Sequence, residues 1–218
     1  MALITIVFNI ARFPISREAR FCYAYAMYIV GVDEAGRGPL AGPVAVGVLL
    51  APKDFDFYAV FPKLNDSKKV SEKRREEMFE TLVAYAKEGT LSFCVKSVDA
   101  PTIDRVGISS AIASCVEAGV RSLADPHTSH VYLDGSLHAP KEYSQETVID
   151  GDASIPAIML ASIAAKVSRD RVMKQLAKTY PHYGFEQHKG YGTKLHIHAI
   201  RTMGLTPIHR RSFCRAFA

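Results

Sequence analysis

Two adjacent carboxylates at the end of an apolar stretch are the first residues whose placement could support chemistry. Asp33 and Glu34 end this stretch, and the turn Gly36-Arg37-Gly38 follows after one alanine. Because neighbours in a strand project to opposite faces, two such acids can act at one site only where the strand ends. Glycine permits the required bend, since it adopts positive φ at little cost. Buried acids are unfavourable unless a cation or a hydrogen-bond network neutralises them, so we expect a functional site here.

Two further aspartates stand at the ends of later predicted elements. Asp134 closes the short apolar segment 130–134, and it therefore repeats the arrangement of a core strand that delivers a carboxylate to the end of a sheet. Asp152 lies just before a long predicted helix, where it could cap that helix or reach the same site. We interpret the neighbouring Asp150 as a turn residue.

These four carboxylates come without a serine or cysteine nucleophile in a motif with a paired histidine. A cluster of acids alone favours hard, oxygen-preferring cations such as Mg²⁺ or Mn²⁺. Two such ions about 3.5–4 Å apart can activate water and stabilise the leaving oxygen of a phosphodiester. The acids therefore indicate metal-dependent hydrolysis, provided that the fold brings them together.

The elements that must position these acids alternate between strands and helices. The first two predicted strands are almost continuously apolar, as expected for a sheet that is covered on both faces. Helices follow N-cap residues such as Ser71 and Asp99. The predicted strands are 28–33, 44–50, 91–97, 130–134 and 147–150, and the predicted longer helices are 71–88, 108–123, 155–179 and 193–203. In the third of these helices we expect a charged and exposed second half, comprising Lys166, Arg169, Asp170, Arg171 and Lys174.

Composition indicates one sizeable domain with a core, or one domain plus a small appendage, since the chain has 218 residues that are 48% hydrophobic. The net charge of +5 is carried entirely by residues 181–218, which hold six Lys/Arg and one Glu. Such a basic section indicates either attraction to a polyanion or an ordinary solvated surface. Two of its histidines, His196 and His198, are two positions apart, so they must diverge around a helix and cannot chelate one ion. We expect both to face solvent. We expect the acidic residues Asp104 and Glu117 to be surface charges.

The four cysteines are widely separated, which indicates neither a zinc site nor a disulfide framework. Reduced thiols and a cytoplasmic location are the corresponding expectation. The apolar residues 2–10 are too few to span a bilayer, and no membrane association is predicted. We interpret residues 1–27 as a poorly ordered leader preceding a working start at Met27, with an organelle-targeting segment as the alternative.

The run Gly31-Val-Asp-Glu-Ala-Gly-Arg-Gly-Pro-Leu-Ala-Gly-Pro-Val44 resembles the opening motif of ribonuclease HII, which nicks nucleic acid at ribonucleotides paired with DNA. The resemblance extends over 28–213. It implies an α/β domain of ribonuclease H-like fold over 28–180, with a mixed five-stranded sheet flanked by helices. It also implies that a small helical C-terminal section, 181–218, completes the substrate groove. Arg37 in the turn argues for type HII over the related type HIII.

The resemblance assigns roles to individual residues. The catalytic, metal-holding acids of the family match Asp33, Glu34, Asp134 and Asp152, which implies two Mg²⁺ or Mn²⁺ ions. The backbone of Gly36, Arg37 and Gly38 would grip the ribose 2′-hydroxyl, the group that separates RNA from DNA, while Tyr191 would stack on the next sugar. Lys68 belongs to an Asp-Ser-Lys triplet that the family places near the substrate backbone, although its position before a helix is equally typical of an exposed loop residue.

The implied activity is endonucleolytic cleavage on the 5′ side of ribonucleotides, leaving 3′-hydroxyl and 5′-phosphate ends. The expected partners are an RNA–DNA hybrid or duplex DNA that contains ribonucleotides. We expect a monomer, and nothing in the sequence supports contact with a replication clamp.

Three alternatives need discrimination. Gly36-x-Gly38-x-x-Ala41 loosely fits a dinucleotide-binding fingerprint, but a strand follows it where a helix is required. A non-enzymatic nucleic-acid-binding module would explain the basic section and leave the acids without a purpose; binding that needs no divalent ion would favour it. A different two-metal nuclease, such as a junction resolvase, would share fold and ions, so only substrate preference separates it.

Overall fold

A mixed β-sheet forms the centre of the computed structural model, which describes residues 5–6, 28–62, 64 and 70–217. The strands are β1 (Thr5–Ile6), β2 (Tyr28–Ala35), β3 (Val44–Pro52), β4 (Ser92–Val98), β5 (Ser129–Asp134) and β6 (Ser144–Val148), in the spatial order β1-β4-β3-β2-β5-β6. The pairs among β1, β4, β3 and β2 are antiparallel, whereas β2, β5 and β6 run parallel. The predicted five-stranded sheet is confirmed as β2 to β6, and the two-residue β1 adds to the β4 edge.

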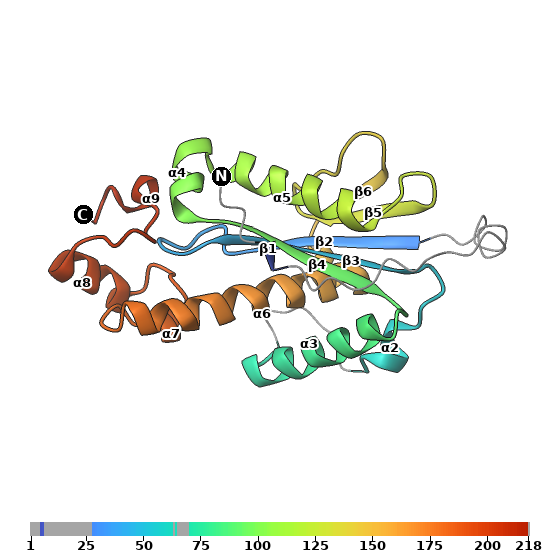
Figure 1. Cartoon of the computed structure of the whole chain (residues 1–218), viewed down its shortest axis with the longest axis horizontal. Coiled ribbons are helices and arrows are strands. Elements are labelled where there is room, and N and C mark those ends of the chain that lie inside the picture. Colours follow the sequence, from blue (N-terminus) through green and yellow to red (C-terminus); the bar gives the residue numbers. More distant parts are fainter. Residues whose placement is uncertain (1–4, 7–27, 63, 65–69, 218) are drawn as a thin grey trace.

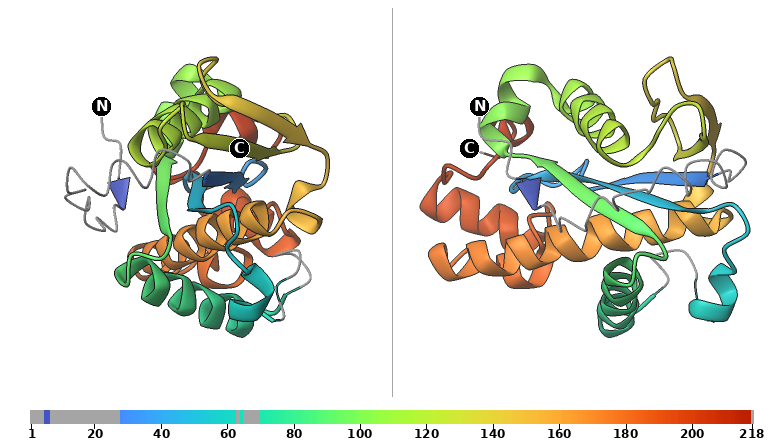
Figure 2. Two further views of the ribbon diagram at one scale, coloured as in Figure 1. Left: turned by 90° about the vertical axis from the view of Figure 1, so that its right-hand side faces the viewer. Right: turned by 45° about the vertical axis from the view of Figure 1, so that its right-hand side comes forward.

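Helices cover both faces of this sheet (Figures 1 and 2). One face packs against α3 (Glu72–Lys87) and α6 (Pro156–Thr179), and the other against α5 (Ile108–Leu123). Two short helices, α2 (Phe57–Val60) and α4 (Ala100–Val106), lie in the connections. The N-caps predicted at Ser71 and Asp99 are confirmed, since each side chain accepts a backbone N–H of its helix. The strands β2, β3 and β4 are therefore mostly buried on both sides, as their apolar residues predicted, whereas the edge strand β6 is largely exposed.

The contact between α6 and the sheet depends on glycines in the strands. A Cβ on Gly31 would lie 2.1 Å from the backbone carbon of Ala157, and one on Gly47 would lie 2.1 Å from the Ala161 carbonyl oxygen. Because these neighbours are backbone atoms of a buried helix, neither site can accept a side chain without moving α6. The small residues of α6 thus pack directly against the glycines of β2 and β3.

The C-terminal section packs against one end of α6 and consists of α7 (Phe185–His188), α8 (Lys194–Met203) and α9 (Arg211–Cys214). Tyr183 and Phe185 join a buried cluster with Met173 of α6. Asp104 of α4 accepts hydrogen bonds from the backbone N–H groups of Arg211, at 2.7 Å, and Ser212, at 3.0 Å. Asp104 is therefore a tether for the C-terminal section, and the expectation of a simple surface charge was incomplete.

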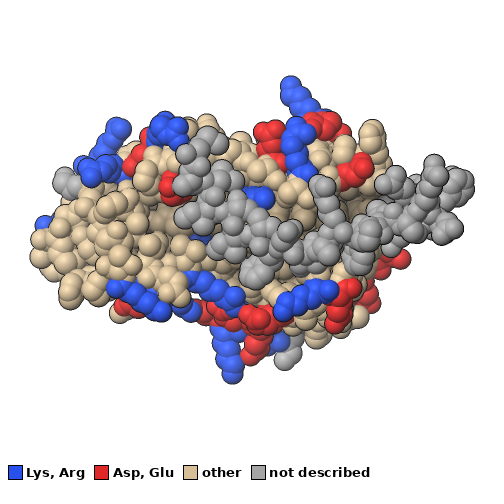
Figure 3. Space-filling model, viewed as in Figure 1, with Lys and Arg blue, Asp and Glu red and all other residues tan. Residues whose placement is uncertain are grey.

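Ion pairs connect α3 with α6 on the outer surface. Arg171 pairs with Glu76 at 2.5 Å, and Lys174 pairs with Glu72 at 2.6 Å. Acidic and basic side chains accordingly lie together along the edge of the molecule at α3 (Figure 3).

Two expectations about exposure were wrong. On α6, Arg169 is 1% and Asp170 4% exposed, because the helix continues past the sheet under the C-terminal section. His196 is fully buried, whereas His198 is exposed as expected. The divergence of the two histidines is confirmed, since one side of α8 faces the interior.

The region after β5 also differs in detail from the prediction. The fifth strand runs over Ser144–Val148 and so begins and ends earlier than the predicted 147–150. Asp150 has a φ of 53°, which confirms its interpretation as a turn residue. The expected leader lies outside the described residues except for β1. Among the described helices, none has the length and apolar character needed to cross a membrane.

Candidate active site

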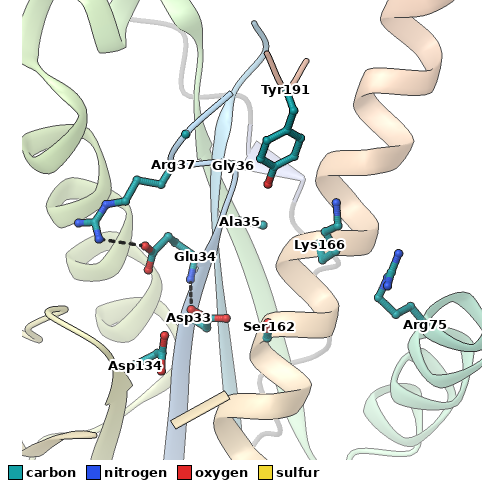
Figure 4. A pocket seen from close by; sticks show the side chains of 11 residues that line it. Asp33, Glu34, Ala35, Gly36, Arg37, Arg75, Asp134, Ser162, Lys166 and Tyr191 are labelled. Atoms are coloured by element: carbon teal, nitrogen blue, oxygen red, sulfur yellow. Dashed lines mark hydrogen bonds and ion pairs between the residues drawn. The ribbon is translucent and has the colours of Figure 1, made fainter. Parts of the chain in front are cut away.

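The register of two parallel strands brings the first and third acids together. β2 and β5 pair up to Val32 and Leu133, and the next residues of the two strands are Asp33 and Asp134. Carboxyl ends of neighbouring parallel strands lie at the same edge of a sheet, where ligands bind in open α/β sheets. Glu34 comes one residue later on β2, close to the strand end at Ala35. Figure 4 shows the three carboxylates side by side at this edge.

A cleft of about 500 Å³ opens over these carboxylates. Its lining contains seven of the residues predicted from the sequence: Asp33, Glu34, Gly36, Arg37, Gly38, Asp134 and Tyr191. It also contains three polar residues that the prediction missed, namely Arg75 on α3 and Ser162 and Lys166 on α6. The last two are four positions apart and so share a helix face, but the sequence did not show which face of α6 meets the cleft.

Burial sets the charge state of the central acid. Asp33 is 5% exposed, and this burial raises its pKa to about 8, helped by the neighbouring carboxylates of Glu34 and Asp134. A hydrogen bond from the Ser162 side chain acts in the opposite direction. The backbone N–H of Glu34 also donates to Asp33 Oδ1, at 2.7 Å. The site therefore holds a carboxyl group that needs a cation nearby in order to ionise at neutral pH.

Cationic side chains surround the acids. Arg37 is half-exposed and its Nη1 lies 3.3 Å from Glu34 Oε1. Lys166 and Arg75 project from the helices on the other side of the cleft (Figure 4). Tyr191 remains 43% exposed, and the centroid of its ring lies 5.7 Å from the Lys166 ammonium. An anionic ligand would thus meet carboxylates on one side and basic groups on the other.

Asp152 lies beside Asp134 but does not line the cleft. It is 3% exposed and belongs to the 3-10 turn η1 (Gly151–Ala153). Its backbone N–H donates to Asp134 Oδ1 at 3.3 Å. The alternative that Asp152 caps α6 is wrong, because the N-cap is Ile155 and no side chain caps that end. The other predicted site residue, Lys68, lies outside the described residues.

The donor set fits hard divalent cations. Three carboxylates of the cleft and the nearby Asp152 offer only oxygen atoms, which Mg²⁺ and Mn²⁺ prefer. The pKa of Asp33 is raised first by burial and then by the neighbouring carboxylates of Glu34 and Asp134, and a bound cation would favour the ionised form of this group. Within the described residues, no three acidic, histidine or cysteine side chains already surround one point at which a metal ion could sit.

The model of the family described as Ribonuclease HII matches residues 30–216 of this chain. A protein named Ribonuclease HII from Endomicrobium trichonymphae is 45% identical over 187 residues, which cover 85% of this chain and 84% of that protein. A protein of the same name from Coxiella burnetii (strain Dugway 5J108-111) is 42% identical over 188 residues, covering 86% and 88%.

Solved structures show the same fold. Ribonuclease H2 from Pyrococcus horikoshii aligns with a TM-score of 0.67 and 24% identity, covering 88% of this chain and 97% of that one. The ribonuclease HII of Archaeoglobus fulgidus, solved with PCNA, gives a TM-score of 0.66 and 22% identity over 84% and 94%. A Bst ribonuclease HIII solved with Mn²⁺ gives 0.59 and 18% over 82% and 63%. These similarities confirm the predicted ribonuclease H-like α/β fold.

Proposed function

The chain belongs to the ribonuclease HII family and is thus an endonuclease of the ribonuclease H class, and we propose that it cuts on the 5′ side of ribonucleotides. Its substrates are RNA–DNA hybrids and duplex DNA with single embedded ribonucleotides, and its products end in 3′-hydroxyl and 5′-phosphate. The observation that carries this proposal is the convergence of Asp33, Glu34 and Asp134 with the Gly36–Gly38 turn and Tyr191 in one cleft.

The acidic side of the cleft is assigned to metal binding. Asp33, Glu34, Asp134 and Asp152 would hold two divalent ions, Mg²⁺ or Mn²⁺. Such ions supply an activated water and charge stabilisation for the leaving oxygen of a phosphodiester. The residues themselves contribute placement: the parallel register fixes Asp33 next to Asp134, and the hydrogen bond to Asp134 keeps Asp152 close. The structural neighbour Bst ribonuclease HIII was solved in complex with Mn²⁺, which supports this assignment.

The other end of the cleft is assigned to recognition of the ribonucleotide. Arg37 and Gly38 are exposed in the turn that follows β2, so their backbone N–H groups can meet the 2′-hydroxyl of a ribose. The exposed ring of Tyr191 offers a flat surface to the adjoining sugar. Selection for RNA at one position therefore depends on contacts that a deoxyribose cannot make.

Binding of the nucleic-acid backbone is assigned to the basic residues. Lys166 and Arg75 line the cleft opposite the acids, and phosphate contacts of this type make affinity dependent on salt. We assign 28–180 to the catalytic domain and 181–218 to a section that completes the groove. The burial of Tyr183 and Phe185 against α6 supports a close union of the two.

Of the alternatives, the dinucleotide-binding fingerprint at Gly36 does not hold, because the glycine turn leads through Pro43 into β3 and not into a helix. A junction resolvase differs in its substrate. The test is to incubate the protein with a DNA duplex that contains one ribonucleotide, with and without EDTA, beside an all-DNA duplex and a four-way junction. We expect a single cut 5′ of the ribonucleotide that EDTA abolishes. Cleavage of the junction, or of the all-DNA duplex at the same rate, would overturn the proposal.

A further inference from the structure

Two arginines are buried next to the turn that follows β2, although arginine is normally a surface residue. Arg169 on α6 is 1% exposed, and Arg210, which precedes α9, is fully buried. All of their hydrogen bonds within the described residues go to backbone carbonyl oxygens. Burying a guanidinium is unfavourable unless its donors are satisfied, so the arrangement calls for a reason beyond packing.

Arg210 holds the turn itself. Its Nη2 donates to the Gly36 carbonyl at 2.6 Å, and its Nη1 donates to the Arg37 carbonyl at 2.9 Å. Its Nε donates to the Gly42 carbonyl at 3.0 Å. A single planar group therefore fixes three peptide units between the end of β2 and the start of β3.

Arg169 holds the second half of the same loop and joins it to the C-terminal section. Its Nε donates to the Pro43 carbonyl at 2.9 Å, and its Nη2 donates to the Lys189 carbonyl at 2.9 Å. The Arg169 Nη1 is buried without a hydrogen-bond partner in the described part of the chain. A Cβ on Gly36 would lie 2.0 Å from Arg169 Nε, so a glycine at position 36 is needed for this contact as well as for its φ of 87°.

The orientation of the carbonyls determines the orientation of the donors that the turn presents. In a planar trans peptide the C=O and the following N–H point in opposite directions. When the carbonyls of Gly36 and Arg37 point at Arg210, the N–H groups of Arg37 and Gly38 must point away from it. Neither N–H has a hydrogen-bond partner within the described residues, and both belong to the exposed part of the turn that lines the cleft.

We infer that Arg210, supported by Arg169, is a positioning residue for ribonucleotide selection: it fixes the carbonyls of Gly36 and Arg37 and so aims two backbone N–H groups at the 2′-hydroxyl. This inference rests on the proposed function, because it assumes that the turn meets the ribose. The two buried positive charges also strengthen these donors, since charge in a low-dielectric surrounding acts with little screening. Neither arginine touches the reacting atoms.

The geometry requires arginine and not merely a positive charge. The planar guanidinium of Arg210 donates to three carbonyls in different peptide units at once. A lysine ammonium is a compact point charge on a flexible side chain and cannot hold this geometry. Arg210→Lys therefore keeps the charge and removes the planar guanidinium. Arg171 provides the matched control, because it lies on α6 two residues from Arg169 but pairs with Glu76 and Glu80 on the surface.

The experiment measures the preference for ribose in binding. In an Asp134→Asn background, which prevents cleavage, dissociation constants are determined for a duplex with one ribonucleotide and for the same duplex made entirely of DNA. We expect Arg210→Lys and Arg169→Lys to lower the preference for the ribonucleotide at least about tenfold while affinity for the all-DNA duplex stays the same. Arg171→Lys should leave the preference intact, and thermal melting verifies that each variant is folded.

Each other outcome has a definite meaning. An unchanged preference in folded Arg210→Lys overturns the inference and leaves the proposed function standing. Equal weakening for both duplexes assigns Arg210 a purely structural role and also overturns it. If the Asp134→Asn parent itself shows no preference for ribose, the recognition role of the turn fails, and the inference fails with it. If Arg210→Lys does not fold, the same comparison of the two duplexes with Arg169→Lys decides the inference.

Discussion

Asp134 Oδ1 accepts a hydrogen bond from the backbone N–H of Asp152 at 3.3 Å. This bond joins the end of β5 to the turn η1, two elements that are separated in the sequence by β6. It explains how the fourth acid stays next to the third while its side chain remains buried. It also makes Asp134 a residue whose structural and chemical contributions can be separated.

Asp134→Asn separates these contributions. Asparagine keeps an oxygen that can accept the Asp152 N–H, so we expect the fold and the binding of hybrid to persist. The negative charge is lost, and cleavage should fall by more than about 100-fold, beyond the usual effect of losing an outer partner of a metal ligand. Cleavage of a hybrid and its binding are measured on the same preparation. Unfolding of the variant would instead make Asp134 structural.

The raised pKa of Asp33 predicts that metal affinity depends on pH. Because the pKa is about 8 without metal, the carboxyl group is protonated below that pH, and binding of a cation must release the proton. Affinity for Mn²⁺ should therefore fall up to about tenfold per pH unit below pH 8. This pH dependence of the affinity is measured as the rise in melting temperature that Mn²⁺ causes between pH 6 and pH 8.5. A rise that does not vary with pH, or that persists in Asp33→Asn, would contradict the prediction.

Tyr191→Ala tests the ring at the edge of the cleft. The side chain is 43% exposed, so its removal should not change stability noticeably. Loss of stacking on a sugar should lower kcat/KM at single ribonucleotides about tenfold, which corresponds to about 1.4 kcal/mol. Tyr191→Phe keeps the ring and should retain most activity. An alanine variant with unchanged kcat/KM would remove Tyr191 from the site.

The buried pair His196 and His209 predicts acid sensitivity. Their Nε2 atoms lie 3.0 Å apart, and burial lowers the pKa of each to about 4, while the second imidazole lowers the pKa of His209 further. The unfolded chain binds these protons near pH 6.5. The contribution of these two histidines to the free energy of unfolding is therefore fully present above pH 6.5. It declines as the pH falls toward 4, by up to about 1.4 kcal/mol per pH unit for each histidine.

Urea unfolding at pH 7.5, 6 and 5 measures this decline. The Asp33→Asn background is used because a carboxyl with a raised pKa contributes a dependence of opposite sign. Imidazole titration by NMR provides the control, because both imidazoles of the buried pair should stay neutral down to pH 5. Normal titration of His196 and His209 would refute the explanation.

Gly31→Ala tests the contact between β2 and α6. The new Cβ would lie 2.1 Å from backbone atoms of Ala157, so the helix must move, and overpacking of this kind typically costs about 1–3 kcal/mol or more. Gly119→Ala on α5 is the comparison: its nearest atom is a methyl group of the buried Val48 at 2.6 Å, so a side chain and not a backbone must shift, and the helix preference of alanine offsets about 1 kcal/mol of the cost. Chemical denaturation should show a clear loss for the first and a much smaller change for the second.

Local features of the sequence determined where most strands and helices form and where most of the acids of the cleft lie. Apolar runs that end at Asp33 and Asp134 predicted two strands with carboxylates at their ends, and N-caps such as Ser71 and Asp99 predicted where helices begin. These predictions succeeded because short apolar runs and helix capping are patterns of a few consecutive residues. The likeness of the run from Gly31 to Val44 to ribonuclease HII gave the family, which the comparisons confirmed.

Only the tertiary structure decided which polar residues are buried and which face the cleft. Arg169 and His196 were expected at the surface, but the C-terminal section covers α6 and one side of α8, and a helix position alone does not reveal such a cover. Likewise, Lys166 and Arg75 meet in the cleft although 91 positions separate them in the sequence. These environments depend on packing between elements that are distant in the sequence, and a local sequence pattern does not predict such contacts.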